Sequence, residues 1–184
     1  EEILDAASFA GINAIIASDF AVIQRARQRN LPVHCSTQLN ISNIDAVRFF
    51  AQYADVMVLA RELSLEQTKN IISAIHKEKI TGPSGKLVRI EIFAHGALCM
   101  AISGKCYLSL HLHDHSANRG ECLQVCRRKY LVTEREQGYQ LEIDNEYIMS
   151  PKDLATIGFL DRIIDAGVDI LKIEGRGRSP EYVK

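Results

Sequence analysis

Short apolar runs rich in β-branched residues alternate along this chain with amphipathic stretches of helical period. Such alternation is typical of βα units, in which each strand of a parallel sheet is followed by a helix that covers the sheet. The pattern therefore predicts an α/β fold with a parallel sheet. The expected strands are 12–17, 32–35, 55–59 and 87–93, and the expected helices are 20–29, 44–51 and 64–79.

The end of the chain carries one more unit of this kind. We predict a helix over 151–166, with Pro151 at its first turn and Gly167 as its C-terminal stop. A strand over 169–173 follows. Another helix signal is the capping-box spacing of Ser64 and Gln67 at the start of the expected helix 64–79.

The number of strands bears on the type of fold. A closed β/α barrel has eight strands and about 250 residues, whereas this chain offers five expected strands in 184 residues. Because Glu1 stands where an initiator Met would be, we expect residues 1–184 to be a partial catalytic domain. The expectation is a parallel β/α barrel of the TIM type, truncated at the N-terminus. A complete doubly wound sheet is the alternative.

An insertion interrupts the alternation at residues 96–149. This segment is rich in Cys, His, Gly and Arg, and it contains a hairpin pattern over 130–143 with a turn at Gln137 and Gly138. A Cys-rich insertion at the end of a barrel strand is expected to form part of the site, since chemistry in parallel β/α folds collects at the carboxyl ends of the strands.

Composition excludes several classes of protein. With 47% hydrophobic and 24% charged residues, the chain has the balance of a globular domain with one substantial core. The net charge of -1 gives no global electrostatic case for nucleic-acid binding. No apolar run of about 18 residues is present, so we expect no membrane span and a cytoplasmic location. The sequence does not indicate an oligomeric state.

Polar side chains follow every expected strand. Helix capping alone explains some of them, such as Ser18 and Asp19. Alternating ionisable residues on the last strand, beginning with Lys172, are expected to be paired or functional, because they would point into the barrel. The candidates for holding substrate or cosubstrate are Gln38, Arg61, Glu91, Glu174 and Arg176.

Four of the five cysteines cluster in the insertion with the pattern C-x6-C-x15-C-x3-C. Four thiolates can bind one zinc ion or one [4Fe–4S] cluster. The wide first pair favours the iron–sulfur cluster, because structural zinc sites usually have two tight pairs. Ordinary buried cysteines are the alternative. The candidate metal ligands are Cys99, Cys106, Cys122 and Cys126.

Cysteine, histidine and basic residues elsewhere in the chain can be interpreted as functional or as ordinary core and surface residues. Cys35 lies inside an expected strand and is interpreted as a core residue, because the adjacent His34 would point to the opposite face. His111, His113 and His115 alternate, so an extended segment would present them on one side as a metal or phosphate site, or simply as a solvated loop. The basic residues Arg119, Arg127, Arg128 and Lys129 suit an anionic substrate such as RNA or a carboxylate.

Several runs resemble the signature of peptidase family U32, a family of collagenase-like peptidases. They are EIFAHGALC at 91–99, SGKCYLS at 103–109, STQ at 36–38, SANRG at 116–120 and KIEGR at 172–176. The resemblance implies a barrel catalytic domain. Relatives of this family include enzymes that hydroxylate tRNA or rRNA bases or ubiquinone precursors. Some of these enzymes hold an iron–sulfur cluster through cysteines, which the resemblance implies for this chain as well.

Three functions remain open at this point. The first is an iron–sulfur-dependent enzyme that hydroxylates tRNA or rRNA. The second is a collagenase-like peptidase with a peptide substrate, although the chain has no G-x-S-x-G elbow, no H-E-x-x-H helix and no assignable catalytic cysteine. The third is a binding module in which zinc staples the insertion. No catalytic residue is assigned.

Overall fold

The computed structural model describes residues 2–143, 152–175 and 178–184. The chain forms two compact units. Unit 1 comprises residues 1–93 and 156–172, and unit 2 comprises residues 94–155 and 173–184.

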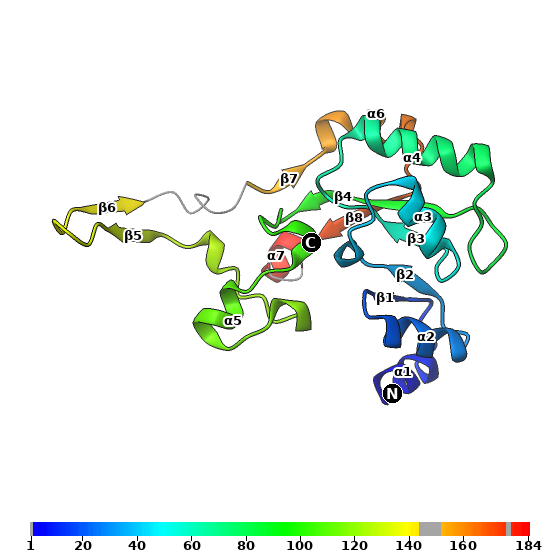
Figure 1. The fold of residues 1–184 in the computed structure, drawn as a ribbon, viewed down its shortest axis with the longest axis horizontal. Helices are drawn as coiled ribbons and strands as arrows, with labels where there is room; N and C mark the ends of the chain where they lie inside the picture. Colours follow the sequence, from blue (N-terminus) through cyan, green and yellow to red (C-terminus); the bar gives the residue numbers. More distant parts are fainter. Residues whose placement is uncertain (1, 144–151, 176–177) are drawn as a thin grey trace. The chain divides into compact units, whose positions relative to one another are not determined.

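Unit 1 is built on a parallel sheet that curls into a half-barrel (Figure 1). The strands β1 (Ile15–Ala17), β2 (Val33–Cys35), β3 (Val56–Val58) and β4 (Arg89–Gly96) pair in parallel in chain order, and β8 (Ile170–Glu174) pairs with β4. This arrangement confirms the predicted α/β fold with a parallel sheet. The first strand is shorter than predicted, because the N–H of Ile12 bonds to the carbonyl of Ala7 at the end of the preceding helix.

Amphipathic helices cover one face of this sheet. They are α1 (Glu2–Phe9), α2 (Phe20–Gln28), α3 (Ile44–Ala51), α4 (Leu65–Glu78) and α6 (Leu160–Asp165). The helices α2, α3 and α4 bury apolar residues at helical spacing, such as Ile71, Ile72 and Ile75 of α4, whereas α1 and α6 each bury one. The helices and alternate strand residues form one apolar core, to which the strands contribute Val33, Cys35, Met57 and Ile90. Cys35 is fully buried, which confirms its interpretation as a core residue, and burial raises the pKa of its thiol to about 12.

Side-chain caps define where the helices begin. Asp19 accepts the N–H of Val22 at the start of α2, and Asn43 accepts the N–H of Ala46 at the start of α3. Before α4, Ser64 Oγ accepts the N–H of Gln67 at 3.2 Å. The Gln67 side chain in turn accepts the N–H of Ser64 at 2.8 Å, so the predicted capping box is confirmed.

Unit 2 begins where the last residues of β4 pair antiparallel with β7 (Leu154–Ala155). It contains the predicted hairpin as β5 (Tyr130–Thr133) and β6 (Gln140–Ile143), and the short helices α5 (Leu108–His113) and α7 (Pro180–Val183). Most of the remainder is irregular. Single 3-10 turns are η2 (Ile102–Gly104), η3 (Ala117–Arg119) and η4 (Val125–Arg127), while η1 (Thr37–Leu39) and η5 (Ile157–Phe159) belong to unit 1.

One sequence prediction was wrong in this part of the chain, and one of two open alternatives is excluded. The helix predicted for 151–166 begins only at Leu160, because Leu154 and Ala155 pair with β4 instead, and Pro151 lies outside the described residues. The extended arrangement considered for the three histidines is not found. His111 and His113 lie in α5, where residues two apart point in nearly opposite directions. Within the described ranges, no helix is long and apolar enough to cross a bilayer.

The capping box yields a prediction about stability. Replacing Ser64 with alanine removes the acceptor for the Gln67 N–H, and we expect a loss of about 1 kcal/mol in the free energy of unfolding, measured by denaturant titration. Ser73→Ala is the matched control, because Ser73 is exposed in the interior of α4, where alanine is the better helix former. Equal effects of the two substitutions would contradict the prediction.

Candidate active site

The strands of unit 1 carry ionisable side chains on the face that the helices leave uncovered. Neighbouring residues of a strand point to opposite faces. Ile90 belongs to the helix-facing core, so Glu91 points to the other face. His34 lies on that same face, since Val33 and Cys35 on either side of it both belong to the core. Strand periodicity therefore brings a histidine and a carboxylate from different strands to one side of the sheet.

Glu91 lies at the centre of this group. The residue is only 5% exposed. Lys172 Nζ lies 2.9 Å from Glu91 Oε1, and His34 Nδ1 lies 3.9 Å from Glu91 Oε2. A buried carboxylate is strongly unfavourable without a compensating charge, and Lys172 supplies that charge. The expectation that Lys172 is paired is thereby met.

His34 is neutral in this environment. Burial lowers its pKa from the ordinary value of 6.5, and the nearby carboxylate of Glu91 opposes the shift without reversing it. Charges on Arg89 and Lys172 lower the pKa further. At pH 7 the imidazole therefore has a ring nitrogen that can accept a proton.

Arg61, one of the predicted substrate-binding residues, completes the group. Its Cζ lies 4.3 Å from the centroid of the Phe93 ring, and Lys172 Nζ lies 5.6 Å from the same centroid. Nε and Nη1 of Arg61 are buried and have no hydrogen-bond partner among the residues described. We call His34, Arg61, Glu91, Phe93 and Lys172 the interior cluster.

Gln38 lies just beyond the carboxyl end of β2, in the turn η1. Ser18 Oγ donates to Gln38 Oε1 at 2.9 Å, and Ser36 Oγ accepts the Gln38 N–H at 3.3 Å. These bonds join the segments that follow β1 and β2, so the predicted position of Gln38 at the strand ends is confirmed. Its role in substrate binding stays a prediction.

The last two predicted substrate-binding residues are Glu174 and Arg176. Glu174 ends β8 and belongs to unit 2, whereas Arg176 lies outside the described residues. The Glu174 carbonyl approaches Gly96 so closely that a Cβ atom on Gly96 would lie 2.0 Å from its oxygen. Gly96 also has a φ of +112°, so this contact requires glycine. The substrate-binding roles of Glu174 and Arg176 stay predictions.

The cysteines of unit 2 are reduced, and two of them accept backbone hydrogen bonds. Cys99 Sγ accepts the N–H of Ala101, and Cys106 Sγ accepts the N–H of Leu108, both at 3.4 Å. Hydrogen bonds to sulfur are among the interactions that tune cysteine ligands of iron–sulfur clusters. The donor atoms of these cysteines therefore suit the predicted cluster.

The arrangement of these donor atoms does not yet form a complete ligand set. Cys122 is exposed, whereas Cys126 is half-buried like Cys99 and Cys106. In the described segments, no three His, Cys, Asp or Glu side chains converge as the ligands of one metal ion would. We therefore assign no chemical step to a metal here, and the [4Fe–4S] cluster, or zinc in its place, stays a prediction.

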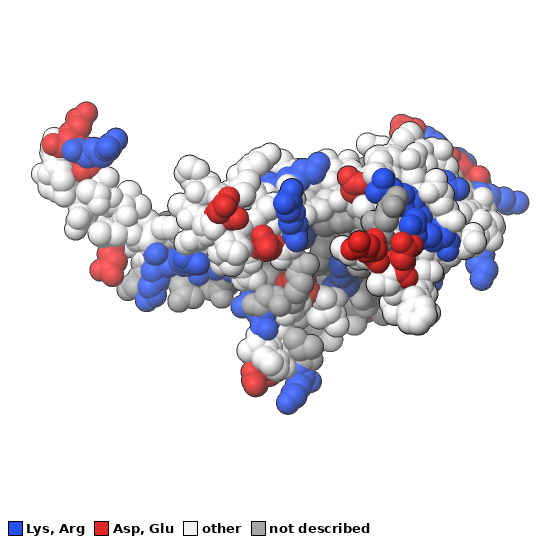
Figure 2. Space-filling model, turned by 90° about the horizontal axis from the view of Figure 1, so that it is seen from below, with Lys and Arg blue, Asp and Glu red and all other residues white. Residues whose placement is uncertain are grey.

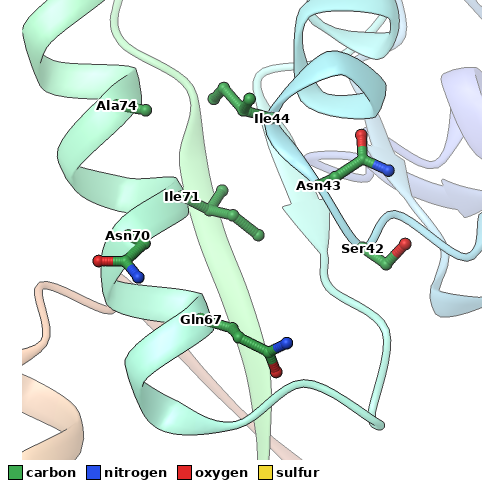
Figure 3. A pocket seen from close by; sticks show the side chains of 7 residues that line it. All are labelled: Ser42, Asn43, Ile44, Gln67, Asn70, Ile71 and Ala74. Carbon is green, nitrogen blue, oxygen red and sulfur yellow. The ribbon is translucent and has the colours of Figure 1, made fainter.

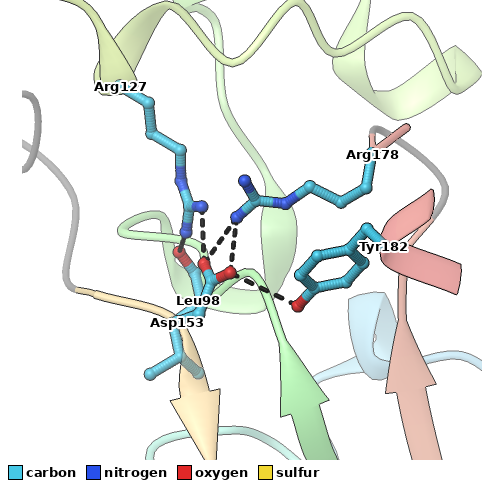
Figure 4. Close-up of polar contacts among 5 residues, drawn as sticks. All are labelled: Leu98, Arg127, Asp153, Arg178 and Tyr182. Carbon is cyan, nitrogen blue, oxygen red and sulfur yellow. Dashed lines mark hydrogen bonds and ion pairs between the residues drawn. The ribbon is translucent and has the colours of Figure 1, made fainter. Parts of the chain in front are cut away.

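Asp153 connects several parts of unit 2 (Figure 4). Arg127 Nη1 donates to Asp153 Oδ1 at 2.7 Å, Arg178 Nη2 lies 2.6 Å from both carboxylate oxygens, and the Tyr182 hydroxyl donates to Oδ2 at 3.3 Å. Burial raises the pKa of Asp153, but the hydrogen bond from Arg127 and the charge of Arg178 outweigh it and hold the pKa below 3.8. The carboxylate is thus ionised and multiply bonded at neutral pH.

Arg127 also makes a bond that bears on the cysteines. Its Nη2 donates to the carbonyl oxygen of Leu98 at 3.2 Å (Figure 4). Leu98 directly precedes Cys99, and Arg127 directly follows Cys126. One guanidinium therefore links the two segments that carry these cysteines, and Asp153 holds that guanidinium in place.

A shallow pocket of unit 1 lies elsewhere, between α3 and α4 (Figure 3). Its polar lining includes Asn43 and Gln67, whose side-chain oxygens already cap the two helices. Ile44 and Ile71 supply apolar lining. Because its main polar groups already serve the backbone, this pocket is a weaker candidate site than the interior cluster.

Sequence reasoning missed the part that His34 and Asp153 play. His34 was considered only as a partner of Cys35, and strand alternation excluded that pairing. The same alternation places His34 on the face of Glu91 once β2 and β4 are known to lie in one parallel sheet with β3 between them. For Asp153 the local sequence carries no such signal, since its partners lie 25 and 26 positions away from it.

Comparison with known proteins places these residues in context. The chain matches the family described as Peptidase family U32 along residues 1–184. It is 59% identical over 181 residues to a Porphyromonas gingivalis protein named collagenase. The aligned region covers 98% of this chain and 44% of that protein. No solved structure matches the chain.

Proteins named for RNA modification are also similar. The chain is 38% identical over 190 residues to tRNA hydroxylation protein P1 of Bacillus subtilis, covering 100% of the chain and 42% of that protein. It is 37% identical over 178 residues to 23S rRNA 5-hydroxycytidine C2501 synthase of Escherichia coli, covering 95% of the chain and 25% of that protein. The chain thus spans less than half the length of these relatives.

The contacts of Asp153 generate a prediction for unit 2. In Asp153→Asn the two arginines lose their counter-charge, and we expect a loss of about 1.5–3 kcal/mol in stability, seen as faster hydrogen exchange at Leu98–Met100. The contribution of Asp153 to the free energy of unfolding should be fully present above pH 3.8, and it should decline as the pH falls towards the lowered pKa of Asp153. Glu142→Gln on the exposed hairpin is the control and should change little. Unchanged exchange in Asp153→Asn would refute the linking role of Arg127.

Proposed function

The chain belongs to peptidase family U32, and from this we propose that it supplies catalytic residues of an enzyme that hydrolyses peptide bonds in a polypeptide substrate. The observation that carries the proposal is the 59% identity to a protein named collagenase, against 38% or less for the two RNA-modifying relatives. We further propose that the parallel sheet is part of a TIM-type barrel, a fold whose catalytic groups come from the strands and the loops that follow them.

The chemistry of the interior cluster supports hydrolysis. Peptide hydrolysis needs a base that takes a proton from water and a positive charge that stabilises the oxyanion of the tetrahedral intermediate. In this proposal neutral His34 takes the proton, and the water oxygen attacks the carbonyl carbon. Lys172, held by Glu91, stabilises the oxyanion. The C–N bond then breaks, and the protonated His34 returns the proton to the departing amine.

RNA hydroxylation is the second candidate, and the clustered cysteines favour it. It would use Cys99, Cys106, Cys122 and Cys126 as ligands of an iron–sulfur cluster, as the resemblance to RNA-hydroxylating relatives implies. The electrostatic support is modest. Asp153 already engages Arg127, and lysine and arginine side chains are interspersed with acidic ones on the face seen in Figure 2. Arg119, Arg128 and Lys129 are the other members of the basic group around Cys122 and Cys126.

The pH dependence of hydrolysis tests the role of His34. Because the proposed base must be unprotonated, kcat/KM of the intact protein on a collagen-derived peptide should fall on the acid side, with a midpoint below pH 6.5. His34→Gln should lower kcat by about 100-fold or more and remove this acid limb. His76→Gln, an exposed histidine of α4, is the control. An unchanged profile in His34→Gln would exclude His34 as the base.

Metal analysis tests the second candidate. Iron, sulfide and zinc are measured on the intact protein purified without oxygen, together with its absorption spectrum. About four irons with equal sulfide, lost in the double variant Cys99→Ser and Cys106→Ser but kept in Cys35→Ala, would support the cluster. One zinc without iron would indicate a structural staple instead. Hydroxylated nucleosides in RNA treated with the enzyme, without peptide cleavage, would overturn the peptidase proposal.

A further inference from the structure

The five residues of the interior cluster, taken by themselves, carry a net positive charge. Lys172 and Arg61 are both cationic, His34 is neutral, and Glu91 is the one carboxylate paired within the cluster. Lys172 binds Glu91 Oε1 at 2.9 Å, so the carboxylate is already engaged. One positive charge is left over, and it resides on Arg61.

Arg61 is also held in a defined place with donors to spare. Its guanidinium lies over the Phe93 ring, with Cζ 4.3 Å from the ring centroid. Stacking of this kind orients the guanidinium without using any of its N–H groups. Nε and Nη1 are buried and have no hydrogen-bond acceptor in the described part of the chain. Burial of unpaired charged donors is unfavourable, and an anionic ligand would relieve it.

The charge balance identifies the kind of anion. A carboxylate carries one negative charge and would neutralise the cluster, and its two oxygens match the planar N–H donors of a guanidinium. A phosphate dianion would leave an excess negative charge next to Glu91. A phosphodiester carries one negative charge and would balance the cluster equally well, so the choice of a carboxylate over a phosphodiester rests on the proposed peptidase function.

We propose that Arg61 binds a carboxylate group of the substrate, so that the enzyme acts on peptides that carry a carboxylate close to the scissile bond. This proposal rests on the peptidase function and specifies its substrate. The carboxylate can belong to the C-terminus of the peptide or to an Asp or Glu side chain. In both cases Arg61 positions the peptide beside His34 and Lys172.

Binding measurements on the intact protein test the proposal without requiring cleavage. Two matched pairs of short peptides serve as probes. One pair differs only in having a C-terminal carboxylate or a C-terminal amide, and the other differs only in Asp or Asn at an internal position of an amidated peptide. We expect the wild type to bind the carboxylate member of one pair about 10- to 100-fold more tightly, the range of a charged hydrogen bond.

Variants of Arg61 test whether this residue causes the preference for the carboxylate peptide. Arg61→Met keeps an apolar contact with Phe93 but has no charge, so it should abolish the preference for the carboxylate member of the pair. Arg61→Lys should retain part of the preference, because it keeps the charge without the planar donors. Arg48→Met, which removes an exposed arginine bound to Glu78, is the control and should keep the full preference. If Arg61→Met fails to fold, Arg61→Lys and the wild-type comparison decide.

The outcomes separate this proposal from the peptidase function. Loss of the preference in Arg61→Met together with no cleavage by the wild type would support the carboxylate site and reject the peptidase function. Cleavage by the wild type with equal binding of both members of each pair would overturn the carboxylate site and leave the peptidase function standing. Displacement of the peptide by an equal concentration of acetate would assign the site to a free small carboxylate and overturn the peptide assignment.

Discussion

The ion pair between Glu91 and Lys172 joins β4 and β8 on the face of the sheet that the helices leave uncovered. A carboxylate that is 5% exposed needs a compensating charge. Placing Lys172 there brings an ammonium group beside His34 and the Phe93 ring, and these contacts set the electrostatic character of the site. Burial keeps His34 neutral, and Nε and Nη1 of Arg61 have no hydrogen-bond partner among the described residues, so a proton acceptor and two unpaired donors lie on the same face as this buried ion pair.

The two faces of the parallel sheet have different roles: the helix-facing side stabilises the unit, and the opposite face carries the residues of the interior cluster. The helix-facing side is apolar throughout, and residues such as Met57 and Ile90 are fully buried there. This packing stabilises the unit through the hydrophobic effect and holds the strands in register. Because apolar packing on the helix-facing side stabilises the unit, the opposite face can carry the polar residues His34, Glu91 and Lys172. Polar groups at such positions are generally unfavourable for stability, and their presence favours a functional role.

Unit 2 is organised by polar contacts more than by an apolar core. Several of its apolar side chains are exposed, such as Leu131 and Tyr139 of the hairpin. Asp153 instead gathers Arg127 and Arg178, and Arg127 reaches the carbonyl beside Cys99. A segment stabilised in this way depends on each charged partner, so the segments that carry Cys99 and Cys126 are coupled to one carboxylate. The residues of both candidate sites, the interior cluster and the four cysteines, are thus far apart in the sequence.

Local patterns in the sequence were sufficient for much of unit 1. Alternating apolar runs determined the parallel strands, and the Ser64 and Gln67 spacing determined the start of α4, because such signals act between residues close in the chain. Tertiary structure decided what local patterns could not. Pairing of Leu154 and Ala155 with β4 displaced the start of α6, and the helix α5 excluded an extended arrangement of the histidines. Strand register brought His34 to Glu91, and only the folded chain left Nε and Nη1 of Arg61 without an acceptor in its described part. The physical reason is that pairing, burial and charge compensation depend on distances in space, which the order of residues along a strand does not specify.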